Sequence, residues 1–96
     1  MRFEIMARTM EGEVCPTGEE FECADALGFV DELALRQPFN RCQAGKQDET
    51  MRVISVAVAR LPWKPVALKV EGRTVETRAE SFLLESLRVG LVRKAG

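Results

Sequence analysis

The chain has 96 residues, of which 46% are hydrophobic and 30% charged, a balance typical of a folded domain and not of a disordered segment. It contains no histidine, which excludes active sites of the Ser-His-Asp and Cys-His kinds. The longest candidate span, residues 53–61, is much shorter than the roughly 20 apolar residues of a membrane-crossing helix, and no signal-peptide pattern is present. We therefore expect one cytoplasmic α+β domain over residues 1–96, without membrane association.

The net charge of −1 conceals an asymmetry along the chain. Residues 1–35 carry two basic and nine acidic side chains, a net charge of −7. Residues 36–96 carry twelve basic and six acidic side chains, a net charge of +6. Either the two parts neutralise each other within one fold, or they form a bipolar surface that meets a basic partner, nucleic acid or further copies of the chain.

Alternation of apolar and polar residues predicts a strand over 2–9, followed by a turn at Glu11-Gly12. A second strand begins at Val14, is broken or bulged at 15–18, and resumes at 20–22. A helix follows over 23–36, because Leu27, Val30, Leu33 and Ala34 share one stripe at helical spacing. The alternative is a helix that starts earlier, at the capping-box pattern Thr17-x-x-Glu20.

Residues 37–50 lack periodicity and are expected to be an irregular loop. Segment 51–61 alternates with apolar or small residues on both faces, which favours a central strand. A turn over 62–65, a strand over 66–70 and a tight hairpin at Glu71-Gly72 into 74–77 follow. The last helix begins at the capping-box pattern Thr77-x-x-Glu80, and its apolar face carries leucines 83, 84, 87 and 91.

The expected order is therefore β-β-α-β-β-β-α. Strands linked by hairpins predict a mainly antiparallel sheet of four to five strands. The two amphipathic helices would pack on one face of this sheet.

No cofactor or metal site is predicted from the sequence. The three cysteines, Cys15, Cys23 and Cys42, have spacings that match no zinc motif, and Gly45-Lys46 lacks the remaining residues of a phosphate-binding loop. Cys42 is the candidate reactive thiol, because the neighbouring cations Arg41 and Lys46 would lower its pKa. Its alternative role is that of a small apolar residue that packs the loop.

Residues of three kinds are candidates for partner binding. The first is an acidic group around one turn region, formed by Glu11, Glu13, Glu19, Glu20 and Glu22. The second is the pair Arg41 and Lys46 in the irregular loop. The third is Trp63, which lies in a proline-flanked turn and has the large apolar area of an interface anchor.

These features predict a non-enzymatic protein-binding module, such as a small inhibitor, adaptor or immunity-type protein, with a partner that is a basic protein. Size and acidic charge are also similar to those of phage-borne inhibitors of nucleic-acid machinery, anti-CRISPR proteins included. The alternatives are a nucleic-acid-binding protein that uses the basic residues of 36–96, and a small enzyme that works through a thiol or carboxylates. A homodimer is compatible with each of these functions.

Overall fold

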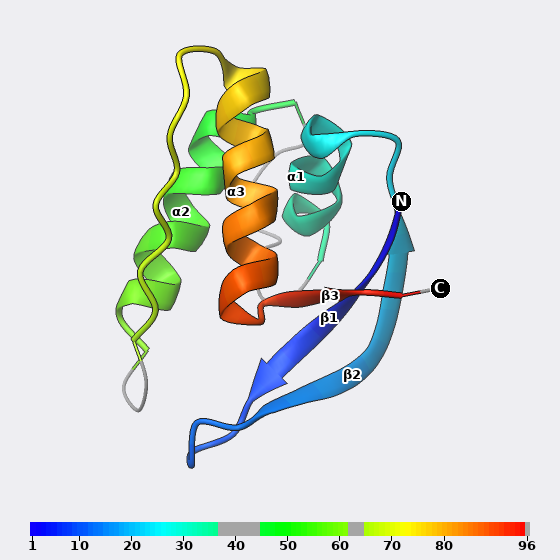
Figure 1. Cartoon of the computed structure of the whole chain (residues 1–96), viewed down its shortest axis with the longest axis vertical. Coiled ribbons are helices and arrows are strands. Elements are labelled where there is room, and N and C mark those ends of the chain that lie inside the picture. Colours follow the sequence, from blue (N-terminus) through cyan, green and yellow to red (C-terminus); the bar gives the residue numbers. More distant parts are fainter. Residues whose placement is uncertain (37–44, 62–64, 96) are drawn as a thin grey trace.

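The computed structural model describes residues 1–36, 45–61 and 65–95. These residues form three strands and three helices in the order β-β-α-α-α-β (Figure 1). The strands make one antiparallel sheet in the spatial order β2-β1-β3, and the helices lie on one side of it. The chain is thus α+β, but the expected sheet of four to five strands with two helices is wrong.

The N-terminal hairpin has the predicted strands, β1 (Arg2–Arg8) and β2 (Val14–Glu22). Its pairing is irregular, because the register shifts between Glu4 and Met6, opposite the segment where the sequence predicts a break. In a regular strand Ile5 and Met6 would point to opposite faces of the sheet. Here both line the same cavity, together with Arg8. The irregularity therefore turns the end of β1 so that Met6 and Arg8 face the helices.

Helix α1 (Ala26–Ala34) begins three residues later than the predicted 23–36. The Asp25 side chain caps it by accepting a 2.8 Å hydrogen bond from the backbone N–H of Gly28. Phe29, Val30 and Leu33 on its inner stripe are buried. The alternative start at Thr17 is wrong, since that residue belongs to β2.

The segment expected to be the central strand is instead helix α2 (Gln47–Ala59). Its buried residues Met51, Ile54 and Val58 repeat every three to four positions, as in a helix packed by one stripe. The apolar run satisfies a period of two equally well, and its β-branched residues favour a strand. Contacts with α1 and α3 select the helix. Residues 47–50 of the expected loop form its first turn, while 37–44 lie outside the described residues.

The segment 65–70 has the burial alternation of the predicted strand but pairs with no described strand. The backbone of this segment forms hydrogen bonds with side chains of α3 (Val75–Val89), which take the place of a neighbouring strand. Glu85 accepts a hydrogen bond from the N–H of Lys69 at 2.8 Å, and the Ser81 hydroxyl donates to the Lys69 carbonyl at 3.0 Å. Because α3 occupies these backbone groups, the segment lies along the helix as extended chain.

The predicted hairpin at Glu71-Gly72 is wrong, because the chain enters α3 there. Thr74 caps this helix, and Thr77, expected at the cap, is the third helical residue of the capping box. Gly72 has a φ of +147°, and a Cβ atom would approach the Thr77 hydroxyl oxygen to 2.5 Å, so only glycine fits. Gly90, in the left-handed conformation, ends the helix before β3 (Val92–Lys94), a strand that the sequence does not predict.

Four phenylalanines join the sheet to the helices at the centre of the core. Phe29 of α1 packs edge-on against Phe3 of β1 with ring centroids 5.1 Å apart, and it also contacts Phe82 of α3 at 6.1 Å. Phe21 of β2 completes the cluster. In the described part of the chain every helix is too short or too polar to cross a bilayer.

Replacing Val56 with Ala tests the helical assignment of α2. Val56 is 40% exposed, so the change removes little packing, and Ala is the better helix former. We expect the free energy of unfolding to stay constant or rise by up to about 0.5 kcal/mol, measured by urea denaturation. If this segment were a strand, Val56→Ala would lower the free energy of unfolding by up to about 1 kcal/mol. Ile54→Ala, at a fully buried position, should cost about 2–5 kcal/mol and serves as the reference.

Candidate functional site

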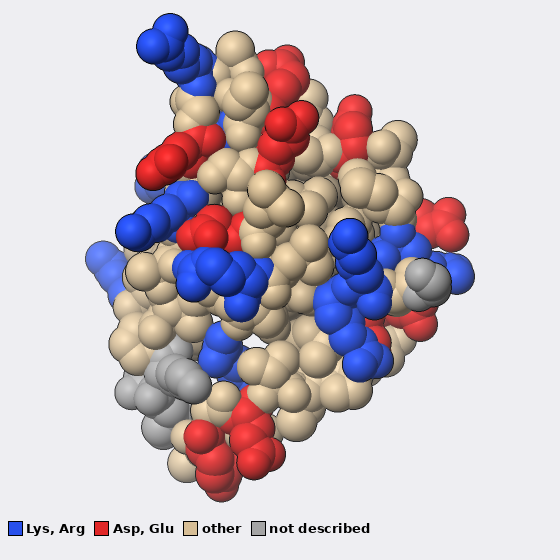
Figure 2. Space-filling view, viewed as in Figure 1, with Lys and Arg blue, Asp and Glu red and all other residues tan. Residues whose placement is uncertain are grey.

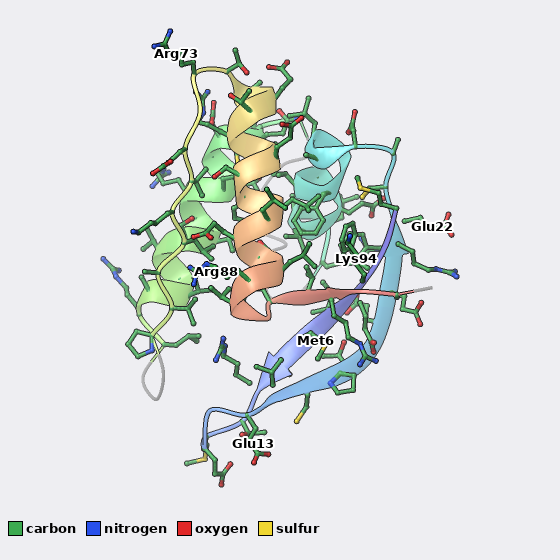
Figure 3. All side chains as sticks on the ribbon, viewed as in Figure 1. Met6, Glu13, Glu22, Arg73, Arg88 and Lys94 are labelled. Atoms are coloured by element: carbon green, nitrogen blue, oxygen red, sulfur yellow. The ribbon has the colours of Figure 1, made fainter. Side chains whose placement is uncertain are left out.

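The predicted acidic residues do not gather into one patch. Figure 3 shows Glu13 beside the hairpin tip and Glu22 at the opposite end of β2. Glu19 pairs with Arg36, 3.4 Å away, which also lies 4.9 Å from the centre of the Phe21 ring. Because β2 is long and its successive side chains alternate between faces, a run of acidic residues in sequence becomes separate groups in space.

The two glutamates near the end of β2 are partly neutralised. Arg2 of β1 lies 3.5 Å from Glu20 and 3.6 Å from Glu22, measured from its Nε atom to a carboxylate oxygen. All three side chains are exposed, so these ion pairs contribute little to stability. Glu11, with Glu13, lies at the exposed hairpin tip. The strongest negative surface expected from the sequence is thus divided between two ends of the hairpin.

The other predicted site residues are only partly in the described chain. Lys46 is exposed and directly precedes α2, where a cation opposes the helix dipole. Arg41, Cys42 and Trp63 lie outside the described residues, and their predicted roles stay predictions. The described residues contain no group of three or more metal-ligating side chains.

The two described cysteines are half-buried. Burial raises the pKa of the Cys23 thiol, and the nearby carboxylates of Glu32 and Asp25 raise it further. A raised pKa lowers the fraction of thiolate, which is the nucleophilic form. Cys23 is therefore poorly suited to covalent chemistry.

A buried carboxylate links all three strands. Glu4 of β1 is 6% exposed and accepts a hydrogen bond from Arg93 of β3 at 2.8 Å. Its second oxygen accepts the backbone N–H of Gly18 in β2 at 2.9 Å. These two donors, Arg93 first, lower the pKa of Glu4. The arrangement holds the edge strands to β1 and has no open position for a substrate, so we assign it a structural role.

Glu85 of α3 also has a structural role. Hydrogen bonds from Arg88, at 2.7 Å, and from the N–H of Lys69 lower its pKa to about 2. Arg88 also donates to the carbonyl of Ala67 at 3.1 Å (Figure 3). The pair therefore fixes the extended segment 65–70 against the helix.

An apolar groove lies between α3 and the ends of β1 and β3. It has a volume of about 310 Å³ and is lined mainly by Met1, Phe3, Leu83, Leu84 and Leu87, with Arg2, Lys94 and Ala95 at its border. Leu84 is 65% exposed and Met1 56%, although the sequence places Leu84 on the buried face of its helix. Large exposed apolar side chains that adjoin each other are typical of binding surfaces.

The strand beside this groove is an edge of the sheet. On its inner side β3 is bonded to β1, where the Leu91 carbonyl accepts from Met6 N–H and Ala95 N–H donates to the Arg2 carbonyl, each at 2.9 Å. Backbone groups of an antiparallel strand alternate in direction. Those of Val92 and Lys94 therefore point away from β1, where no described strand follows, but Val92 is 1% exposed and only Lys94 is open to solvent.

A second hollow lies at the other end of β3. It is an apolar cavity of about 230 Å³ between β1, α1 and α2, and its lining includes Ile5, Leu33, Ile54, Val58 and Leu91. Arg8 lines both this cavity and an open cleft on the outside of the molecule. The sequence gives no sign of this role, because regular alternation places Arg8 on the solvent face of β1.

The carboxylates of Glu4 and Glu85 should make the free energy of unfolding depend on pH in the acidic range. Each has a pKa below its ordinary value of 4.5 in the folded protein, so the stabilisation is present above that pH and is lost as the pH falls. We expect the free energy of unfolding to decline steadily from about pH 5 toward pH 2. Glu85→Gln should flatten this decline, as measured by urea denaturation at a series of pH values. Glu11→Gln, at the hairpin tip, is the matched control and should leave the slope unchanged.

Two mainly apolar hollows of the described residues are candidate ligand sites: the groove beside the β3 edge and the cavity bordered by Arg8. They lie at opposite ends of β3, since Lys94 borders the groove and Val92 lines the cavity. Neither contains a set of groups that could serve as nucleophile and base. Comparisons with protein-family models, with curated proteins and with solved structures find no match for this chain.

Proposed function

We propose that this protein is a non-enzymatic protein-binding module that receives an extended segment of its partner along β3. The observation that carries the proposal is the apolar groove next to a strand edge with which no strand of the described residues pairs. A partner strand added beside Lys94 would obtain backbone hydrogen bonds from this exposed residue. Addition of a strand to an exposed sheet edge is a common mode of peptide recognition, in which backbone bonds supply affinity and side-chain pockets supply specificity.

The groove supplies the pocket that this mode requires. Side chains of an added strand alternate between the two faces of the sheet, so every second one would lie on the side of α3. There it meets Leu84, which is exposed, and Leu87, which is half-buried. Burial of this surface stabilises a complex by roughly 25 cal/mol for each Å² removed from water. The partner segment should therefore carry apolar residues at alternate positions.

The charge at the rim of the groove determines which residues are favoured at the remaining positions of the partner segment. β3 carries Arg93, which is paired with Glu4, and Lys94, which has no carboxylate partner among the described residues. Arg2, paired with Glu20 and Glu22, borders the groove, so the free positive charge of the rim is that of Lys94. Two copies joined β3 to β3 would place these cations against each other, which disfavours a homodimer of this kind. An acidic partner segment has the complementary charge, and such rim charges mainly raise the rate of association.

This assignment differs from the basic partner that the sequence alone favours. The acidic residues are divided among the hairpin tip and two faces of β2, and three of them pair with Arg2 or Arg36. The basic strand edge, in contrast, coincides with exposed apolar surface. Apolar area beside a free backbone edge supports binding more strongly than dispersed exposed charge does.

A selection experiment tests the proposal without a known partner. A displayed library of random linear peptides is selected against the protein, and the recovered peptides should alternate apolar residues with Asp or Glu. Their affinity is then measured by fluorescence polarisation. Leu84→Gln should weaken binding by about tenfold or more, since it removes the apolar wall of the groove. Leu35→Gln is the matched control, because Leu35 is 63% exposed but lies at the end of α1, outside the groove.

Backbone methylation of a selected peptide separates strand addition from simple apolar contact. Methyl groups on the alternate nitrogens that face β3 should abolish binding, whereas methyl groups on the intervening nitrogens should leave it intact. Equal effects of the two methylation series, or equal losses in the Leu84 and Leu35 variants, would contradict the proposal. Concentration-dependent self-association of the free protein would show that a second copy occupies the edge instead.

A further inference from the structure

The cavity bordered by Arg8 is large for the interior of so small a protein. Protein cores pack as densely as organic crystals, and voids larger than a water molecule are few. This one has a volume of about 230 Å³ and is lined by Ile54 and Val58 of α2, Leu33 of α1 and Ile5 of β1. Apart from Arg8, all its lining side chains are apolar. Water has few polar partners there, so an apolar ligand would be favoured over water.

Arg8 provides the one charge at the wall of this cavity. It is half-buried, and its Nη2 atom donates a hydrogen bond to the Val89 carbonyl, which fixes the side chain across the hollow. Its Nε atom is fully enclosed and has no hydrogen-bond partner in the described part of the chain. Within residues 1–36, 45–61 and 65–95 no carboxylate pairs with Arg8. A cation in such surroundings is stabilised by an anionic partner more than an exposed cation is.

The outer side of Arg8 adjoins an open cleft of about 480 Å³ between the β1–β2 hairpin and the segment 65–69. Lys69 and Arg88 also line this cleft, and no acidic side chain belongs to its lining, but Arg88 is paired with Glu85, so among the described residues Lys69 supplies the second unneutralised cation. Figure 2 shows a hollow below α3 with Lys or Arg atoms on its borders. The approach to Arg8 is therefore positively charged, which attracts anions toward the cavity.

From these features we infer that the protein binds a small aliphatic carboxylate, with the hydrocarbon chain in the cavity and the carboxylate on Arg8. The planar guanidinium matches a carboxylate through parallel N–H···O bonds, and a charge-assisted bond of this kind is among the stronger hydrogen bonds. A cavity of about 150 Å³ holds the six carbons of benzene, so this one holds about nine carbon atoms. The preferred ligand is thus a chain of medium length, such as octanoate.

Isothermal titration of the full chain with butanoate, octanoate, tetradecanoate and octan-1-ol, each below its aggregation threshold, tests this inference. Octanoate should bind more tightly than the shorter and the longer carboxylate, and about tenfold or more tightly than octan-1-ol. Octanoate should also raise the melting temperature, because it binds only the folded state. Equal affinity for octanoate and octan-1-ol, or no binding of either, would overturn the inference.

Variants identify the two parts of the site. Arg8→Met should remove the preference for octanoate over octan-1-ol, while Arg8→Lys, which keeps the charge, should retain part of it. Leu91→Phe should fill the cavity and weaken both ligands alike. Arg60→Met is the matched control, because this exposed cation at the end of α2 borders neither the cavity nor the cleft. If Arg60→Met lowers octanoate affinity as much as Arg8→Met does, general charge and not Arg8 holds the carboxylate.

This site is independent of the peptide surface. Leu84→Gln should leave octanoate affinity unchanged, since Leu84 does not line the cavity. Loss of octanoate binding in Leu84→Gln would mean that the ligand occupies the groove, which would overturn the assignment to the cavity. Failure of the peptide selection, in contrast, would have no bearing on the carboxylate site.

Discussion

The packing of Phe29 is the constraint on which the rest of this structure depends. Its ring is fully buried and contacts phenylalanines from β1, β2 and α3, so one side chain joins the hairpin to two helices. Burial of a phenylalanine stabilises a fold by about 1.5–3 kcal/mol, and each favourable aromatic pair adds about 0.5–1.5 kcal/mol. Because the described sheet has three strands, such a cluster fixes α1 and α3 on it. The grooves and cavities lie around this fixed centre.

The irregular pairing between Glu4 and Met6 gives the two ends of β1 different surroundings. Before it, Phe3 enters the aromatic cluster while Glu4 turns to the other face and binds Arg93 and Gly18. After it, Met6 and Arg8 turn toward the helices. An arginine cannot fill apolar space as a leucine would, because its charged group requires a polar partner. A cavity beside Arg8 is therefore the physical result of the altered register.

β3 relates the two proposed binding surfaces to each other. Leu91 and Val92 border the cavity, whereas Lys94 and Ala95 border the groove, so a strand of three residues separates a peptide surface from a carboxylate site. The strand is held by backbone bonds to β1 and by the pair of Arg93 with Glu4. It begins two residues after Gly90, so the end of α3 determines its position. The positions of both binding surfaces therefore depend on the turn at Gly90.

By itself the sequence determined the α+β class, the N-terminal hairpin, α1 and most of α3, because local signals act there. Alternation marks β1, the apolar stripe of Leu27, Val30, Leu33 and Ala34 marks α1, and the expected cap at Thr77 lies within three residues of the observed cap at Thr74. It also indicated, through the alternation of Val66, Leu68 and Val70, which side of an extended segment would be buried. These properties depend on neighbours in sequence, which periodicity and capping describe directly.

The other features of the fold and of the candidate sites were decided only by the tertiary structure. An apolar run such as 51–59 satisfies helix and strand alike, and packing against α1 and α3 selected the helix. The extended segment 65–70 pairs with no described strand because Glu85 and Ser81 occupy the backbone groups of Lys69. The acidic residues separated because side chains alternate along β2, and Arg8 turned inward because the register shifts. Each outcome depends on partners distant in sequence, which no local pattern contains.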